Sequence, residues 1–557
     1  MFPLDVLKFS DLFTGGQLIT YLLMSLLNAV IILLSSMKFI LVLQQCNYRG
    51  KRYFKWLSHK DTPYMSRLML LCMMALFFFC VLNMTFVSML GNTAVSYVGL
   101  ISYILFSTMY INTEKNINAK IPLKKTRRLV RLCITYFILC FGLTFGVITL
   151  SNYVAFVIGN EVFAILRLFI ICLLPLLIPL ILFLAYLINE PIEYLIRKYY
   201  ILTAVNTLNK TSVIKIGITG SFAKTSVKEI LKTILSQKYR VLATPYSYNT
   251  PLGIARTVKM LDSTHDVFIA EMGARQKGDI KELARLVNPK YGVITGVNHQ
   301  HLESFGSIEN TMDTKFELFE NLSSDGVGLF SSGNENAIKL YERFSGEKYL
   351  AGANGENALV GAKNIVIDER GTTFTLVIDG EEVECSTVLL GTHSVRNICL
   401  ASAVAYKMGL TPKEIASGIE KIRSIDHRLE LVKNNKNIVI IDDSYSANEE
   451  GVKSAMEVLD NFKGRKIVLT PGLVELGKVE NLVNFEFGKT LSNHADYVIV
   501  VGKHNAEMII KGLIEGGMQK ENIKFAKNLN KGNAILNEML MEGDVVLFEN
   551  DLPDNYN

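Results

Sequence analysis

The chain has 557 residues, of which 50% are hydrophobic and 20% charged, and its mean hydropathy is +0.27. Soluble globular domains have a similar apolar share but carry about 25% charged residues. The polar residues are therefore expected to be unevenly distributed. High apolar content and only 8 cysteines exclude a disordered chain, a collagen-like chain and a disulfide scaffold.

The net charge of +6 taken alone would suggest an acidic partner such as nucleic acid. Residues 1–190 hold 16 Lys and Arg against 6 Asp and Glu, a net charge of +10. Residues 191–557 hold 42 against 46, a net charge of −4. Because the more polar region is mildly acidic, we expect no nucleic-acid partner.

Long apolar runs occupy the first third of the chain. They cover approximately residues 18–43, 68–90, 95–111, 129–150 and 168–188. A helix that crosses a bilayer needs about 20 apolar residues, and each run reaches or approaches that length. The sequence therefore predicts a helical transmembrane domain of about five spans over residues 1–190.

The connecting loops predict the orientation of these spans. The 44–67 and 112–131 loops carry six and seven Lys and Arg, whereas the 91–94 and 151–162 loops carry none. The positive-inside rule places the N-terminus outside and the basic loops in the cytoplasm. A cytoplasmic linker over 191–211 and the rest of the chain would then follow on the cytoplasmic side of a multi-pass membrane protein. A transporter is disfavoured, since no acidic residue lies inside a span.

From residue 212 the pattern changes to α/β, with short buried strands alternating with helices. The predicted strands are 213–219, 267–271, 292–295, 438–442, 466–470 and 497–501. We expect a central nucleotide-binding domain over 212–423 and a Rossmann-like domain over 424–557. Alternating residues and turn signals near 356–390 predict a small antiparallel insert in the first of these.

The sharpest chemical signal is the sequence ITGSFAKTS at 218–226. A strand, a short turn and a helix start follow one another, which is the arrangement of a phosphate-binding loop. Lys224 can reach the β- and γ-phosphates, and the Thr225 hydroxyl can hold Mg²⁺. Ala223 and Ile218 stand where the usual pattern has glycine, so an ordinary strand–helix turn remains an alternative. If residue 223 needs a positive φ, alanine costs about 1 kcal/mol there.

Acidic and histidine residues after later strands favour the phosphate-binding interpretation. Glu271 ends a strand, which is where a Mg²⁺ ligand belongs beside a phosphate loop. Two histidines in the 298–303 segment, which is NHQHLE, become metal-ligand candidates beside it. Without a metal nearby, the same segment would be an ordinary polar loop.

The motifs in this order resemble the Mur ligase family of ATP-dependent amide-forming ligases, and within it most closely the branch that adds D-alanyl-D-alanine to a muramoyl-tripeptide. The resemblance covers about 212–545. It rests on segments at 219–226, 244–253, 271–280, 301–307 with Lys315, 391–397, 427–430, 442–448 and 472–477.

The resemblance implies a role for each residue at a matching position. Phosphate contacts are implied for Gly220, Ser221, Ala223, Lys224, Thr225 and Ser226. The resemblance also implies that two Mg²⁺ ions are bound, with Thr225, Glu271, His301 and a carbamylated Lys315 as ligands. Asn397 would contact adenine, Asp443 the ribose and Arg428 the γ-phosphate, and catalysis would use Lys224, Lys315, His301 and Arg428. The alternatives are a surface helix lysine at Lys315 and an interdomain ion pair at Arg428.

The chain departs from the family at several positions. Ala223, Ser394, Ser446 and Gly296 replace the usual residues, and 548–556 does not match the usual ending of the branch. Apolar spans also stand where the family has the domain that holds the UDP part of the acceptor. These departures put the identity of both substrates in doubt.

The sequence thus predicts a membrane-anchored ligase that uses ATP and Mg²⁺. It would join a cell-envelope precursor, with a lipid-linked one among the candidates, to an amino acid or dipeptide. Membrane lipid and other envelope-synthesis enzymes are the further partners expected. The alternatives are a polyglutamate-type synthetase, which adds amino acids repeatedly, and a non-catalytic membrane scaffold that responds to nucleotide.

Overall fold

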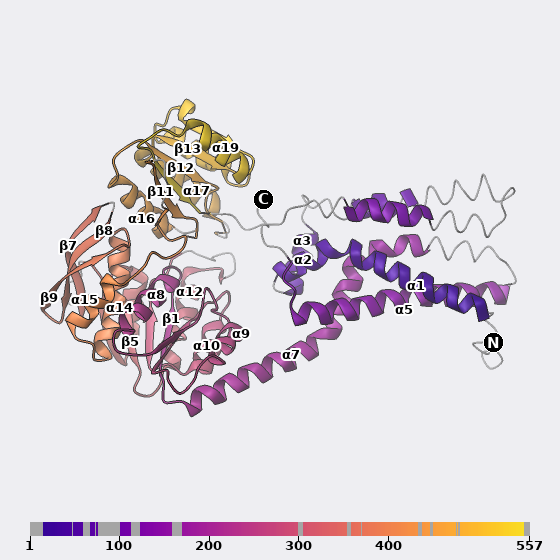
Figure 1. Cartoon of the computed structure of the whole chain (residues 1–557), viewed down its shortest axis with the longest axis horizontal. Helices are drawn as coiled ribbons and strands as arrows, with labels where there is room; N and C mark the ends of the chain where they lie inside the picture. The colour runs from indigo at the N-terminus through magenta and orange to yellow at the C-terminus, as the bar shows by residue number, and fades with distance from the viewer. Residues whose placement is uncertain are drawn as a thin grey trace. The chain divides into compact units, whose positions relative to one another are not determined.

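The structure is a computed structural model, and it describes most of the chain. The described residues are 15–46, 48–58, 67–72, 74–75, 101–112, 123–158, 170–298, 305–353, 358–368, 370–432, 437–445, 449–474, 476 and 479–550. The chain divides into two compact units, Met1–Ile196 and Arg197–Asn557 (Figure 1).

Apolar helices form the described part of the first unit. They are α1 (Gly15–Ser35), α2 (Met37–Gln45), α3 (Gly50–Leu57), α5 (Arg127–Ile158), the 3₁₀ turn η2 (Leu174–Leu177) and α7 (Ile178–Lys210), with shorter helical stretches at 67–72 and 101–112. Within the described part of the chain, three stretches are long and apolar enough to cross a membrane: Leu18–Ser35, Arg127–Val154 and Ile170–Lys210. They coincide with the first, fourth and fifth predicted spans. The second lies largely outside the described residues. Of the third, the structure describes 101–111 as helical, and both stay predictions.

Polar contacts fix how these helices pack. The buried Asn28 on α1 donates a hydrogen bond to Thr144 on α5 at 3.0 Å and accepts one from Tyr103 at 2.8 Å. Arg128 and Arg131, at the start of α5, pair with Glu190 and Glu193 on α7 at 3.0 and 2.6 Å. Buried polar groups need such partners inside an apolar bundle, so these contacts specify one arrangement of α1, α5 and α7.

The second unit begins on the last turns of α7. Ala204 and Leu208 are buried in a core that also contains Ile254 and Leu283. The 191–211 segment, for which sequence analysis predicts a linker, is therefore the C-terminal part of a helix. Its buried side chains secure it to the domain that follows.

A nine-stranded sheet organises the middle domain. Its strands are β1 (Ile214–Thr219), β2 (Val241–Ala243), β3 (Val267–Glu271), β4 (Tyr291–Ile294), β5 (Val327–Ser331), β6 (Glu347–Ala351), β7 (Val360–Asp368), β8 (Gly371–Ile378) and β9 (Glu381–Thr387). The order is β2-β3-β1-β4-β5-β6-β7-β8-β9. Strands up to β7 pair in parallel, whereas β7, β8 and β9 pair antiparallel and extend the same sheet at one edge.

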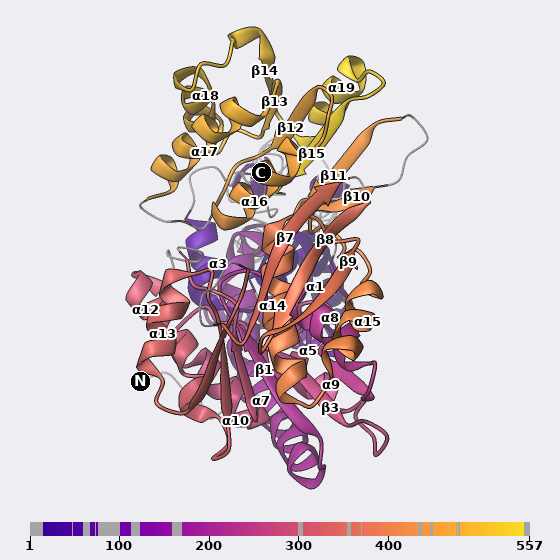
Figure 2. The ribbon, with the colours of Figure 1, turned by 90° about the vertical axis from the view of Figure 1, so that its left-hand side faces the viewer.

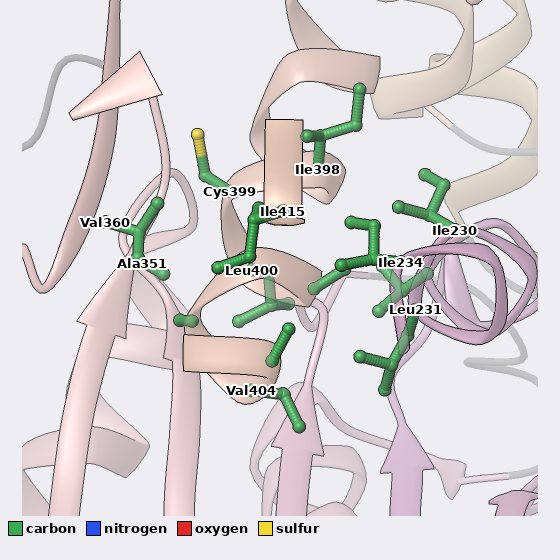
Figure 3. Close-up of a cluster of buried hydrophobic side chains, with 14 of the residues drawn as sticks. Ile230, Leu231, Ile234, Ala351, Val360, Ile398, Cys399, Leu400, Val404 and Ile415 are labelled. Carbon is green, nitrogen blue, oxygen red and sulfur yellow. The ribbon is translucent and has the colours of Figure 1, made fainter. Parts of the chain in front are cut away.

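Helices cover both faces of this sheet. They are α8 (Lys224–Leu235), α9 (Pro251–Val258), α10 (Asp279–Val287), α12 (Ile308–Phe316), η3 (Phe319–Asn321), α13 (Glu335–Arg343), α14 (Thr392–Lys407) and α15 (Pro412–Glu420). Figure 3 shows apolar side chains of α8, α14 and α15 meeting above the strands. Ile230 and Ile234 of α8 contribute from one side and Leu400 and Val404 of α14 from the other, all fully buried or nearly so. The burial of these apolar side chains holds α8 against β1, and it thereby positions the loop that precedes α8.

The C-terminal domain has a six-stranded sheet of order β10-β11-β15-β12-β13-β14. In its described part, β10 alone runs antiparallel. Its strands are β10 (Glu430–Val432), β11 (Val439–Asp443), β12 (Lys466–Thr470), β13 (Tyr497–Val501), β14 (Ile523–Ala526) and β15 (Val545–Glu549). Its helices are α16 (Glu449–Asp460), α17 (Glu480–His494), α18 (Ala506–Glu515), η5 (Lys520–Asn522) and α19 (Leu529–Met539). Figure 2 shows α17 and α18 side by side on one side of the sheet and α19 on the other. The α/β class predicted for both domains is confirmed.

Candidate active site

The predicted phosphate loop lies between β1 and α8. Gly220, Ser221 and Ala223 belong to the loop, and Lys224 is the first residue of the helix, followed by Thr225 and Ser226. Backbone N–H groups at a helix N-terminus attract anions, because they have no partner within the helix. The loop therefore has the local geometry that phosphate binding requires.

Ala223 has a left-handed backbone, with φ of 59° and ψ of 1°. The sequence pattern places glycine here for this reason, since a Cβ atom is strained in that region by about 1 kcal/mol or more. The substitution therefore leaves the loop geometry intact at a cost in stability.

Lys224 bends back over its own loop. Its ammonium group donates hydrogen bonds to the carbonyl oxygens of Gly220 at 2.8 Å and Ser221 at 3.1 Å. Burial lowers the pKa of Lys224 to about 8, although the Glu271 carboxylate opposes the shift. The ammonium is thus placed directly beside the loop that would receive phosphates.

Glu271 ends β3 beside this loop and is almost fully buried. Its Oε2 accepts hydrogen bonds from Thr225 at 3.0 Å and from Lys228 at 3.3 Å, while Oε1 accepts one from Asn249 at 3.2 Å. A carboxylate and a hydroxyl in direct contact next to a phosphate loop are oxygen ligands of the kind Mg²⁺ takes. The predicted metal pair of Thr225 and Glu271 is therefore brought together.

Lys228 is a member of this cluster that no sequence motif predicts. It is fully buried on α8 and also donates to the carbonyl oxygen of Tyr246 at 2.5 Å. Its signal in the sequence is its position four residues after Lys224, one helical turn further on. It holds the 244–250 segment against the carboxylate of Glu271.

Lys315 lies on α12 and is only 4% exposed, so the alternative of a surface lysine is wrong. Burial lowers its pKa well below the usual value, and the nearby positive charge of Lys224 adds to the shift. A buried lysine that loses its proton readily is a suitable amine for addition of CO₂. The predicted partner His301 lies outside the described residues.

The 391–397 motif forms the start of α14. Asn397 is half-buried there, and its predicted adenine contact stays a prediction. Burial lowers the pKa of His393 to about 3, with further contributions from Arg396 and Arg428. The neighbouring Thr392 donates to Glu457 of α16 at 2.7 Å, so this helix start contacts the C-terminal domain.

The 427–430 turn presents Arg428. Its neighbours His427 and Leu429 both have left-handed backbones, with φ of 61° and 47°. The His427 ring is held 2.7 Å from Asp442, and the Leu429 N–H donates to Asp443 at 3.1 Å. Strained non-glycine residues persist where surrounding contacts fix them, and here they fix the direction of Arg428.

Arg428 links the two domains electrostatically. Burial lowers its pKa, and the carboxylates of Asp443 and Glu271 are the largest opposing influences. In turn, Arg428 helps to lower the pKa values of Lys224 and His393. The structure thus brings Lys224, Thr225, Glu271, Lys315, Arg428 and Asp443 into one site between the middle and C-terminal domains.

Comparison with known proteins agrees with this geometry. Residues 218–405 match the model of the Mur ligase middle domain, and 427–549 match that of the Mur ligase glutamate ligase domain. The chain belongs to the Mur ligase family, and it is an ATP-dependent carboxylate–amine ligase that forms ADP.

Among the chain's relatives is the UDP-N-acetylmuramoyl-tripeptide–D-alanyl-D-alanine ligase of Bacillus subtilis. It is 30% identical over 337 residues, which cover 60% of this chain and 72% of that protein. Crystal structures of MurF from Acinetobacter baumannii and of MurF from Thermotoga maritima with ADP share the fold. Their TM-scores are 0.58 and 0.57, with 22% and 24% identity, and they align with 64% of this chain and 77% and 80% of theirs.

Gly296 and Phe222 explain a further departure from the family pattern. Gly296 has φ of +155°, and a Cβ atom there would lie 2.3 Å from the Phe222 ring. The ring of Phe222 therefore fills the space that a side chain at residue 296 would need. Phe222 in the loop and Gly296 after β4 are therefore sterically complementary.

We expect Gly296→Asn to lower the free energy of unfolding by about 1–3 kcal/mol, because it overpacks the loop against Phe222. The double variant Phe222→Ala/Gly296→Asn should recover part of the loss, since the clash is removed while the backbone strain stays. Urea unfolding in detergent measures both. An unchanged stability of Gly296→Asn with Phe222 present would contradict the steric pairing.

Proposed function

We propose that the chain is a membrane-anchored ligase that activates the carboxylate of a cell-envelope precursor and joins it to an amino acid or dipeptide. The observation that carries the proposal is the cluster of Lys224, Glu271 and Arg428 between the two domains. It supplies positive charge and a metal-ligating carboxylate at one point. Both are required to transfer a phosphoryl group to a carboxylate.

The proposed reaction has two steps. The precursor carboxylate attacks the γ-phosphorus of ATP, which forms an acyl phosphate and releases ADP. The amine then attacks the acyl carbon, an amide C–N bond forms, and the C–O bond to phosphate breaks. Lys224 and Arg428 bind and neutralise the phosphoryl oxygens, and the buried setting strengthens these interactions. Thr225 and Glu271 would hold Mg²⁺, which adds positive charge to the phosphates when bound.

The acceptor is proposed to be a precursor at the cytoplasmic face of the membrane, with the lipid-linked form favoured. The relatives are named for a UDP-linked tripeptide and D-alanyl-D-alanine. In this chain the region matched to the family begins at residue 218 and follows three membrane-length helices. Basic loops at 44–67 and 112–131 support the cytoplasmic placement of the site.

Membrane vesicles carrying the full chain test activity and orientation together. With ATP, Mg²⁺ and D-alanyl-D-alanine, we expect inside-out vesicles to release phosphate when the lipid-linked muramoyl-tripeptide is present, and right-side-out vesicles to release none. ATP does not cross the bilayer, so only an exposed cytoplasmic site can react. Lys224→Ala should lower the rate at least about 100-fold, because a preorganised charge contributes that much.

The matched control is Lys232→Ala, an exposed lysine two turns further along α8, which should leave the rate unchanged. Phosphate release with the UDP-linked tripeptide but not with the lipid-linked one would exclude the lipid-linked acceptor. Repeated additions detected by mass would favour the polyglutamate-type synthetase. No release with either acceptor would contradict the ligase proposal.

Lys315 is proposed to react with CO₂ and become a carbamate. This would convert a buried cation into an anion able to ligate a second Mg²⁺, together with His301. The support is the burial of Lys315 near the Lys224 ammonium, which disfavours a second positive charge. The carbamate would also balance the charge of Lys224.

Labelling with ¹³C-bicarbonate tests the carbamate by NMR. We expect one protected carbamate carbon signal in the full chain and its loss in Lys315→Met, with at least a tenfold drop in ligase rate. Lys339→Met, an exposed lysine on α13, is the control and should keep the signal. A signal that survives in Lys315→Met would contradict the assignment.

A further inference from the structure

Two carboxylates lie side by side at the end of the second sheet. Glu549, the last residue of β15, is the register partner of Asp443, the last residue of β11. Register partners on parallel strands point to the same face, and here that face carries the Leu429 side chain and α16. The carboxyl ends of parallel strands are the edge on which α/β domains bind ligands.

Glu549 is fully buried, yet among the described residues neither of its carboxylate oxygens has a hydrogen-bond partner. Asp544, just before the other end of β15, is also buried but accepts two hydrogen bonds from Arg465, at 3.0 and 2.7 Å. Buried polar groups are almost always paired, so an unpaired one calls for an explanation, of which a bound ligand or a catalytic role is one. Glu549 thus differs from Asp544, whose carboxylate is paired with Arg465.

The groups that face Glu549 connect it to the phosphate site. Asp443 faces it from β11 and Arg428 from the 427–430 turn, while β12 ends on the uncharged Thr470. Burial raises the pKa of Glu549 well above its usual value, Asp443 adds to the shift, and Arg428 opposes it. Because Arg428 also faces Glu271, Glu549 lies on the C-terminal side of the same site.

A carboxylate at this position selects the charge of the incoming group. It attracts an ammonium and repels a carboxylate. The incoming amine of the proposed ligase is an ammonium in water at neutral pH, and it must lose a proton before it can attack. A carboxylate that binds the ammonium and accepts this proton would meet both needs.

We propose that Glu549 binds the ammonium of the incoming amine and acts as its general base. An N–H bond breaks, the proton moves to a Glu549 oxygen, and the nitrogen lone pair attacks the acyl carbon. The C–N bond forms, and the C–O bond breaks with its electron pair going to phosphate. The second nitrogen proton leaves with the departing phosphate. The proposal rests on the ligase function proposed above.

Hydroxylamine separates this role from the first half of the reaction. It is uncharged at neutral pH and traps an acyl phosphate as a hydroxamate, so it needs no general base. With ATP, Mg²⁺ and the lipid-linked muramoyl-tripeptide, Glu549→Gln should form hydroxamate within about threefold of the wild-type rate. With D-alanyl-D-alanine, its kcat/KM should fall about 10²–10⁴-fold, the usual contribution of a general base.

The pH profile gives a second readout. In Glu549→Gln, kcat/KM for D-alanyl-D-alanine should rise steadily with pH as free amine accumulates, whereas the wild type should level off once Glu549 is ionised. The control is Glu538→Gln, an exposed glutamate on α19, which removes the same charge and should match the wild type. Glu549→Asp, which keeps a carboxylate, should recover part of the activity.

Three results would overturn the assignment. Equal losses of hydroxamate and amide would make Glu549 a structural residue, and unchanged amide formation would make it dispensable. If Glu549→Gln fails to fold, Glu549→Asp takes its place. Equal losses of hydroxamate and amide in Glu549→Asp, with the pH dependence of the wild type, would likewise make Glu549 a structural residue. A wild-type enzyme that forms no hydroxamate with any acceptor would instead contradict the ligase function itself.

Discussion

The position of one buried cation, Arg428, holds the catalytic arrangement together. The Glu271 carboxylate favours the charged guanidinium from the middle domain, and the carboxylates of Asp443 and Glu549 favour it from the C-terminal domain. A buried guanidinium is costly unless carboxylates surround it, and these carboxylates are equally costly without it. The two domains therefore stabilise each other through the group that we propose to face the γ-phosphate. The strained turn at His427 and Leu429 is the local cost of this placement.

Much of this architecture can be predicted from the sequence. Strands β1, β3, β4, β11, β12 and β13 are found within a residue or two of the predicted ranges, because each is a short apolar run between helices. The phosphate loop and Glu271 are predicted from local motifs and Arg428 from the family resemblance, and the structure brings them together. The family resemblance is confirmed by both domain matches.

The remaining features depend on contacts between distant parts of the chain. Glu549 pairs with Asp443 only because β15 inserts between β11 and β12, a sheet order that no local pattern specifies. Lys228 is an ordinary helical lysine in the sequence. Its role follows only from the structure, where it is buried and donates hydrogen bonds to Tyr246 and Glu271. The departure at Gly296 likewise acquires a reason only when Phe222 is seen to lie over it.

The central claim is that Arg428 faces the γ-phosphate while it joins the two domains. Calorimetric titration of Arg428→Met with ADP and with a non-hydrolysable ATP analogue tests it most directly. A hydrogen bond to a charged group contributes about 1.5–3 kcal/mol, so affinity for the ATP analogue should fall at least about tenfold. Affinity for ADP should stay within about twofold of the wild type. Equal losses for both nucleotides, or no loss for either, would contradict the account.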